Sequence, residues 1–127
     1  MKRLIIPLAL FALIGCGGGG QKLIGTNIIM EPGNTFGPET VEVDADSDVS
    51  WTNVDGAPHT VQSDVANMGP DSDGTFANGL NAGQTYVWRV PASAASGTRY
   101  YYHCRFHGTA GNGASLGTGM VGVLIVR

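Results

Sequence analysis

The sequence predicts an all-β domain built as an antiparallel two-sheet sandwich. Two observations lead to this prediction: residues 21–127 show no long helical period, and short β-rich runs alternate with Gly, Pro, Asn and Asp. Strands of this length and spacing are typical of sandwiches and barrels. We expect the strands at residues 22–30, 40–43, 48–53, 59–63, 84–90, 98–104 and 120–126.

The segment ahead of this domain is typical of an export signal. Its first three residues, Met-Lys-Arg, are positively charged, and residues 4–14 form an uninterrupted apolar run of eleven. A membrane-spanning helix needs about 20 apolar residues, so this run is too short to cross a bilayer. A positive start followed by a short apolar run and small residues indicates a secretory signal peptide.

The end of the apolar run resembles the bacterial lipoprotein processing box. Residues 13–16 read Leu-Ile-Gly-Cys, and the resemblance implies that Cys16 carries a lipid and begins the mature chain. The four glycines that follow have no side chains to pack, so they are expected to act as a flexible tether. An ordinary signal peptide that happens to contain a cysteine is the alternative. The expected organisation is a signal peptide at 1–15, the lipidated cysteine and tether at 16–21, and one domain at 22–127.

Alternating side chains support the central strands. Tyr86, Trp88 and Val90 fall on one face of their run, and Pro91 ends it because proline cannot donate to the ladder. The runs at 40–43 and 48–53 repeat this alternation. Residues 64–83, which contain Gly69-Pro70 and three further glycines, predict a long irregular connection with one helical turn.

The charge of the mature chain excludes some functions. Removing the signal leaves about 110 residues, the usual size of one domain with one core. Five basic residues then face ten acidic ones, and a net charge near −5 argues against binding to nucleic acid. The acidic side chains gather in two clusters that we interpret as solvated loop surface: Asp44, Asp46 and Asp48, and then Asp64, Asp71 and Asp73.

Cys104 is the centre of the functional prediction. Two cysteines in an exported chain suggest a disulfide, but a lipidated Cys16 leaves Cys104 as a lone thiol with a chemical role. Cys104 ends a strand and His107 follows three residues later, so a tight turn could aim both side chains at one point. His59 on a neighbouring strand would complete a trigonal plane, and Met120 could cap it weakly. Two imidazoles, one thiolate and a long axial thioether form the blue-copper electron-transfer set.

Several alternatives apply to this cluster of residues. Cysteine, two histidines and a water would also suit zinc, although the thioether favours copper. Strand alternation points His103 away from Cys104, so His103 is interpreted as a surface histidine or a support for the ligands, and Tyr101 is expected to be half-exposed. Thr60 follows His59 directly and is expected to steady the ligand loop.

Four motifs in order resemble the plastocyanin branch of the cupredoxins. They are Phe-Gly-Pro-Glu-Thr-Val-Glu-Val at 36–43, Val-Ser-Trp-Thr-Asn at 49–53, Pro-His-Thr-Val at 58–61, and Tyr-His-Cys-x-x-His at 102–107 with Gly-Met-x-Gly at 119–122. The resemblance covers about residues 24–127. It implies a Greek-key sandwich with one copper ion near one end, held by His59, Cys104, His107 and Met120, with His107 close to the surface. The twelve residues between His107 and Met120 exceed the family's usual interval, and a backbone carbonyl is the alternative axial ligand.

These residues predict a carrier of single electrons and not an enzyme. We expect it to be a monomer that is exported and lipid-anchored in the periplasm or at the cell surface, at the outer membrane if the cell has two membranes. The expected partners are redox proteins such as cytochromes or membrane oxidoreductases, bound transiently. The alternatives are a copper carrier or storage module, and a copper redox enzyme with an open coordination position.

Overall fold

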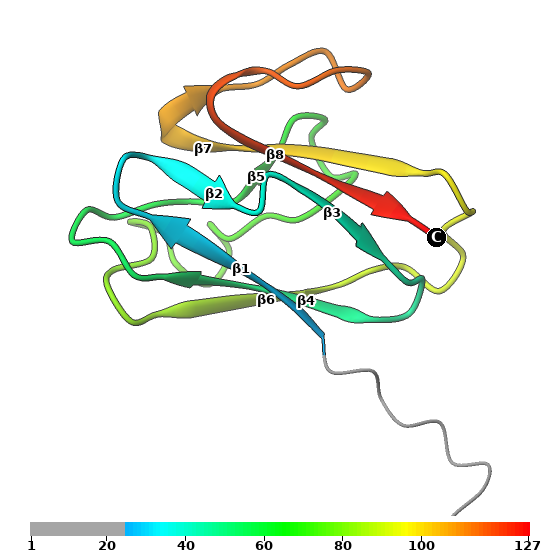
Figure 1. The fold of residues 1–127 in the computed structure, drawn as a ribbon, viewed down its shortest axis with the longest axis horizontal. Helices are drawn as coiled ribbons and strands as arrows, with labels where there is room; N and C mark the ends of the chain where they lie inside the picture. The colour runs from blue at the N-terminus through cyan, green and yellow to red at the C-terminus, as the bar shows by residue number, and fades with distance from the viewer. Residues whose placement is uncertain (1–24) are drawn as a thin grey trace, which may run out of the picture.

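The computed structural model describes residues 25–127. The expected signal peptide, the lipidated Cys16 and the glycine tether therefore lie outside the described residues. The described chain forms eight strands: β1 (Thr26–Glu31), β2 (Thr35–Gly37), β3 (Thr40–Val43), β4 (Asp48–Asn53), β5 (Gln62–Ser63), β6 (Thr85–Arg89), β7 (Arg99–Thr109) and β8 (Thr118–Val126). They make two four-stranded sheets, ordered β2-β1-β4-β6 and β3-β8-β7-β5 (Figure 1).

The all-β sandwich is confirmed, but its sheets are mixed and not antiparallel throughout. Strand β1 pairs with β4, and β3 with β8, in parallel register. A parallel pair needs a crossover between its two strands. The chain provides one because it leaves the first sheet after β2, forms β3 in the second sheet, and returns to the first as β4.

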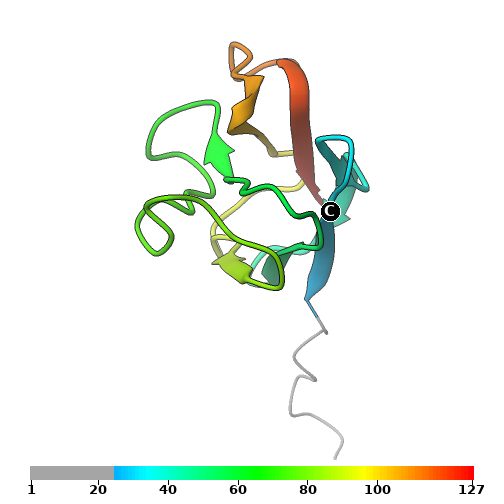
Figure 2. The same cartoon turned by 90° about the vertical axis from the view of Figure 1, so that its left-hand side faces the viewer.

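Several strand boundaries differ from the prediction. Strand β2 was not predicted, β7 continues to Thr109, and the run at 59–63 is a strand only at 62–63. The connection between β4 and β6 is the green segment in Figure 2; only β5 within it belongs to a sheet, and the rest of it extends to one side of the sandwich. Residues 64–83 contain no helix, although the Phe76 N–H donates to the Ser72 carbonyl at 2.8 Å and so closes a single i→i+4 turn. Within residues 25–127 no helix could cross a membrane.

The core lies between the two sheets and is rich in aromatic side chains. Trp51 is fully buried, stacks on Tyr86 at 5.7 Å between ring centroids, and meets Tyr102 edge-on at 5.4 Å. Burial of large rings of this kind provides much of the stabilisation of a small domain. The face predicted for β6 is confirmed at Tyr86, which is buried, whereas Trp88 is only partly buried and packs against the core.

Tyr101 is buried and not half-exposed, so that prediction is wrong. Only 9 % of this residue is accessible, although it points away from the core. The segment that follows β5 covers it: Val65 and Met68 line a small hollow with Tyr101, and Asp64 donates its backbone N–H to the Tyr101 carbonyl at 2.9 Å. A chain segment distant in sequence therefore covers the outer face of β7.

Candidate metal centre

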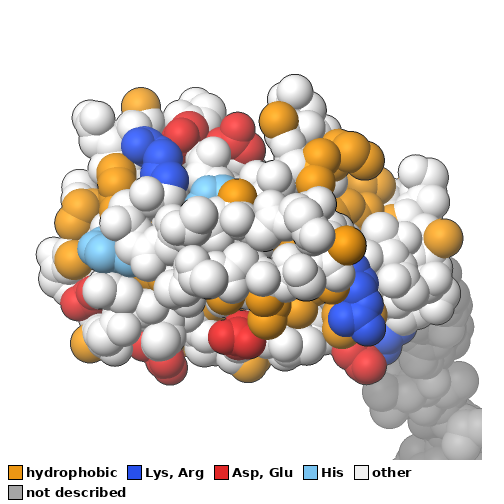
Figure 3. Space-filling model, turned by 90° about the horizontal axis from the view of Figure 1, so that it is seen from above, with side chains coloured by type: hydrophobic (Ala, Val, Ile, Leu, Met, Phe, Trp, Pro, Cys, Tyr) orange, Lys and Arg blue, Asp and Glu red, His pale blue; other side chains and the backbone are white. Residues whose placement is uncertain are grey.

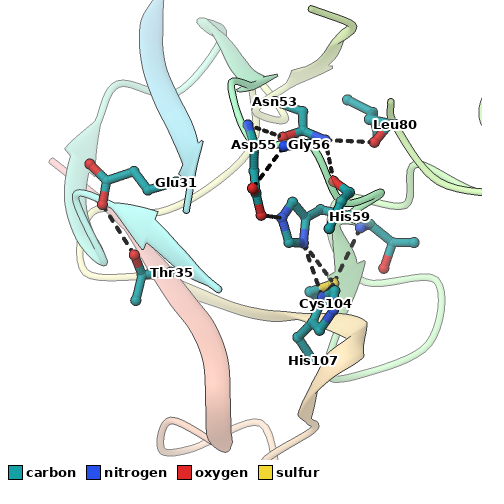
Figure 4. Close-up of polar contacts among 11 residues, drawn as sticks. Glu31, Thr35, Asn53, Asp55, Gly56, His59, Leu80, Cys104 and His107 are labelled. Atoms are coloured by element: carbon teal, nitrogen blue, oxygen red, sulfur yellow. Dashed lines mark hydrogen bonds and ion pairs between the residues drawn. The ribbon is translucent and has the colours of Figure 1, made fainter. Parts of the chain in front are cut away.

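Three predicted ligands meet at one end of the sandwich. The ligand atoms of His59, Cys104 and His107 all lie within 4.8 Å of one another (Figure 4). His59 and Cys104 are fully buried, whereas His107 is partly exposed. His59 comes from the connection after β4, and the other two residues belong to β7.

Backbone pairing and the side chain of Asn53 place His59. His59 forms an isolated bridge with Leu80, in which each backbone N–H donates to the other's carbonyl, at 3.1 and 2.7 Å. The fully buried Asn53 amide donates to the carbonyls of Ala57 and Leu80, both at 2.8 Å. Its carbonyl oxygen accepts the N–H of Asp55 at 2.8 Å. The Asn53 side chain at the end of β4 therefore connects the two chain segments, around Ala57 and around Leu80, that place His59.

An irregularity in β7 brings Cys104 and His107 to the same point. In a regular strand, residues three apart lie on opposite faces. The pairing of β7 with β8 is interrupted between His103 and Gly108, and both ligands lie in this interval. A β-bulge of this kind re-aims side chains and is common beside functional sites.

The sulfur of Cys104 is held by the residue after His59. The backbone N–H of Thr60 donates to Cys104 Sγ at 3.4 Å, and Thr60 Oγ1 accepts the N–H of Arg105 at 2.9 Å. Thr60 is fully buried. Thr60 therefore bonds both the Cys104 sulfur and the backbone of the next residue, Arg105, as expected for a residue that supports the ligands.

The three ligand atoms form a nearly regular triangle. His59 Nδ1 lies 3.1 Å from His107 Nδ1 and 3.8 Å from Cys104 Sγ, and His107 Nδ1 lies 3.7 Å from the same sulfur. A point in their plane is about 2.1 Å from all three atoms, close to the roughly 2.0–2.3 Å bonds of a metal ion to imidazole and thiolate. The donor set therefore fits one metal ion without rearrangement.

A carboxylate that the sequence analysis did not single out supports His59 from behind. Asp55 Oδ2 lies 2.9 Å from His59 Nε2, on the opposite side of the ring from the ligand triangle (Figure 4). This hydrogen bond holds the pKa of the Asp55 carboxyl below its ordinary value, although burial opposes the shift. An ionised carboxylate can only accept, so Nε2 carries the proton and the Nδ1 lone pair faces the metal position.

Met120 lies beside the ligand turn despite the long interval. The β7–β8 ladder resumes at Gly108↔Gly119 and Thr109↔Thr118, so residues 110–117 form a loop beyond it. A Cβ at Gly108 would overlap the carbonyl oxygen of Met120. Met120 itself is only 1 % exposed. Its backbone therefore adjoins the residue after His107.

His103 and Asp64 hold the long loop in place. The His103 ring points to Asp64, with Nδ1 2.8 Å from Oδ1, and is not one of the three clustered ligands. The second oxygen of Asp64 accepts the N–H of Gly111 at 2.9 Å. The Asp64 side chain is only 1 % exposed, so its interpretation as solvated surface is wrong.

The surface near His107 is apolar. His103 and His107 are partly exposed, whereas His59 is fully buried, and Figure 3 shows histidine side chains at the surface of the face that it views. Phe106 is 43 % exposed, and its ring centroid lies 6.3 Å from that of His107. Ala110, Ala114 and Leu116 are exposed on the loop that follows.

Comparisons with known proteins agree with this geometry. The family described as copper binding proteins, plastocyanin/azurin family, matches residues 28–127. A purple cupredoxin from Nitrosopumilus maritimus is 25% identical over 80% of this chain and 99% of its own, with a TM-score of 0.57. A reduced amicyanin mutant is 18% identical over 81% of this chain and 82% of its own, with a TM-score of 0.55.

One enzyme is also similar in structure. The copper-containing nitrite reductase of Thermus scotoductus is 20% identical over 96% of this chain, with a TM-score of 0.58. The likeness covers only 27% of the reductase, so it concerns the fold of one part of that protein. No curated protein matches the sequence.

Proposed function

Because the chain belongs to the plastocyanin/azurin family of copper-binding proteins, we propose that it carries single electrons on one copper ion held by His59, Cys104 and His107. The observation that carries the proposal is the ligand triangle, in which two imidazole nitrogens and one sulfur surround a point at metal-bonding distance. Met120 is the proposed axial ligand because it is buried and its backbone adjoins Gly108.

The chain contributes a fixed set of donors. Copper bound there would supply the Cu(I)/Cu(II) couple. Cys104 and His59 are buried and are held by Thr60 and Asp55, so the donors need little movement when the charge of the site changes. The partly exposed His107 is the proposed route between the site and a partner.

The proposed partner surface surrounds His107. Phe106 and the loop residues Ala110, Ala114 and Leu116 offer a small apolar area, the kind that supports weak redox encounters. The proposed partners are cytochromes or membrane oxidoreductases, met by a protein that is exported and anchored through Cys16. The acidic net charge favours a basic partner, so association should slow as ionic strength rises. Association rates that stay flat across ionic strength would exclude this steering.

A copper redox enzyme is the second candidate, and the likeness to one part of a nitrite reductase favours it. Such an enzyme needs an open coordination position, whereas buried Met120 lies beside the site. Binding of azide or nitrite at the metal would support the enzyme. Ready transfer of the copper to another chelator would instead support the copper carrier.

The proposal is tested by adding one equivalent of Cu(II) to the full chain and recording visible absorption and electron paramagnetic resonance. We expect an intense thiolate-to-copper band that disappears in the Cys104→Ser variant. A competing equivalent of Zn²⁺ should not displace the copper, since divalent affinity peaks at copper. A weak, square-planar copper signal without the intense band would mean that the three-ligand site does not form.

A further inference from the structure

Asp55 is held in a fixed position behind the buried ligand His59. One of its carboxylate oxygens bonds His59 Nε2 at 2.9 Å, and the other accepts the N–H of Gly56 at 2.7 Å. Its own N–H donates to the Asn53 side chain at 2.8 Å. The side chain of Asp55 is 18% exposed and that of His59 is fully buried, so little water can replace this bond.

The two histidine ligands are not equivalent. His59 has a carboxylate partner, whereas within residues 25–127 no carboxylate contacts His107. A carboxylate on the far nitrogen of a ligand imidazole fixes its tautomer and makes it a stronger donor. An imidazole that is bonded to a carboxylate stabilises Cu(II) more than Cu(I), because the negative charge of the carboxylate attracts the more highly charged ion more strongly.

We propose that Asp55 is a positioning residue that locks His59 with its Nδ1 lone pair toward the metal and stabilises Cu(II) over Cu(I). The inference rests on the proposed electron-transfer function and adds the residue that sets its reduction potential. Asp55 acts through His59 and does not itself touch the metal position. Its two effects are separable, because the hydrogen bond fixes the tautomer and the charge sets the balance between the oxidation states.

Two variants separate these effects, and a third serves as a control. Asp55→Asn keeps an oxygen that can accept from Nε2 but removes the charge, whereas Asp55→Ala removes both. Asp73→Asn removes an equal charge near the ligand turn, where Asp73 bonds Arg105 at 3.2 Å, without contacting His59. All variants are made in the full chain.

The tautomer is read in the metal-free protein from the ¹⁵N chemical shifts of the His59 ring. Wild type and Asp55→Asn should show protonation at Nε2, and Asp55→Ala should show a mixture of both tautomers. An unchanged tautomer in Asp55→Ala would overturn the positioning role. This readout needs no copper, so it is independent of whether the proposed function holds.

The potential is read by voltammetry of the copper-loaded protein. In Asp55→Asn we expect the ratio of Cu(I) to Cu(II) affinity to rise about tenfold, the low end of supporting-residue effects. That ratio corresponds to an increase in potential of about 59 mV for a one-electron couple. Asp73→Asn should change the ratio less than about threefold, since its charge is exposed and screened. Equal shifts in potential in Asp55→Asn and Asp73→Asn would mean that Asp55 acts only as a distant charge, and would overturn the proposal. A wild-type protein without the intense copper band would instead refute the proposed function itself.

Discussion

The long loop between His107 and Met120 depends on one buried carboxylate, and its removal is a sharp test of the structure. We predict that Asp64→Ala lowers the unfolding free energy of the metal-free protein by about 2–4 kcal/mol. Asp64 is 1% exposed and has two partners on other segments, His103 at 2.8 Å and Gly111 at 2.9 Å. Alanine would leave both donors without their acceptor.

The magnitude follows from these two contacts. A hydrogen bond to a charged group such as the Asp64 carboxylate contributes roughly 1.5–3 kcal/mol. The side chain of His103 is 15% exposed, so water can partly replace Asp64 there, which places the expected loss toward the lower end. The Gly111 N–H is part-buried and adds the rest of the loss.

Urea unfolding of the metal-free protein measures the loss, with Asp73→Ala as the matched control. Asp73 also pairs with a basic side chain, but Asp73 and Arg105 are 36% and 37% exposed, so this change should cost no more than about 1 kcal/mol. Hydrogen exchange at the Gly111 amide should also accelerate in Asp64→Ala and stay unchanged in the control. The reasoning is refuted if the two variants lose equal stability or if Gly111 exchange does not change.

Three further predictions concern the core and the site. Burial raises the pKa of Tyr102 far above 10, so above pH 10 the unfolded chain releases a proton that the folded one keeps, and stability falls. Tyr102→Phe should therefore lessen the loss of stability between pH 7 and 11. It should cost less than about 1 kcal/mol at pH 7, because within residues 25–127 the buried hydroxyl has no hydrogen-bond partner. Equal losses in both proteins would contradict this. Met120→Leu should keep the intense copper band and raise the Cu(I)/Cu(II) affinity ratio about tenfold, whereas an unchanged voltammogram would assign the axial position elsewhere. Thr60→Val should destabilise the protein by about 1–3 kcal/mol in urea unfolding, since the Arg105 N–H loses its acceptor, and an unaltered potential and copper affinity would count against its role in the site.

Alternation along the chain predicted the strands that have one buried face. Strands β4 and β6 alternate because one face of each, which carries Trp51 or Tyr86, is buried in the core, and their boundaries were predicted to within one residue. The same pattern has no information about the direction of a neighbouring strand, so the two parallel pairs could not be predicted. Strand β2 has only three residues, too few for a period to be visible.

The metal ligands could be predicted from sequence because they lie in short, recognisable motifs. The carboxylates Asp55 and Asp64, which hold the ligand His59 and the long loop, could not. Asp64 lies 39 residues from His103 and 47 from Gly111, and nothing near it in sequence marks it as buried. It therefore looked like one more acid in a solvated cluster. The role of Asp55 was easier to predict, because Asp55 precedes His59 by four residues in an Asn-Val-Asp-Gly turn. Only the folded turn shows that its carboxylate reaches the ring.

The β7–β8 ladder makes the geometry of the site independent of the length of the loop after His107. Pairing stops at His103, the two ligands Cys104 and His107 occupy the interruption, and pairing resumes at Gly108↔Gly119. Both ends of the loop are therefore fixed by the ladder, and Asp64 also holds the loop near its start, at Gly111. Because hydrogen bonds and not chain length place Met120 beside the ligand turn, the loop can vary the surface around His107 without moving the donors.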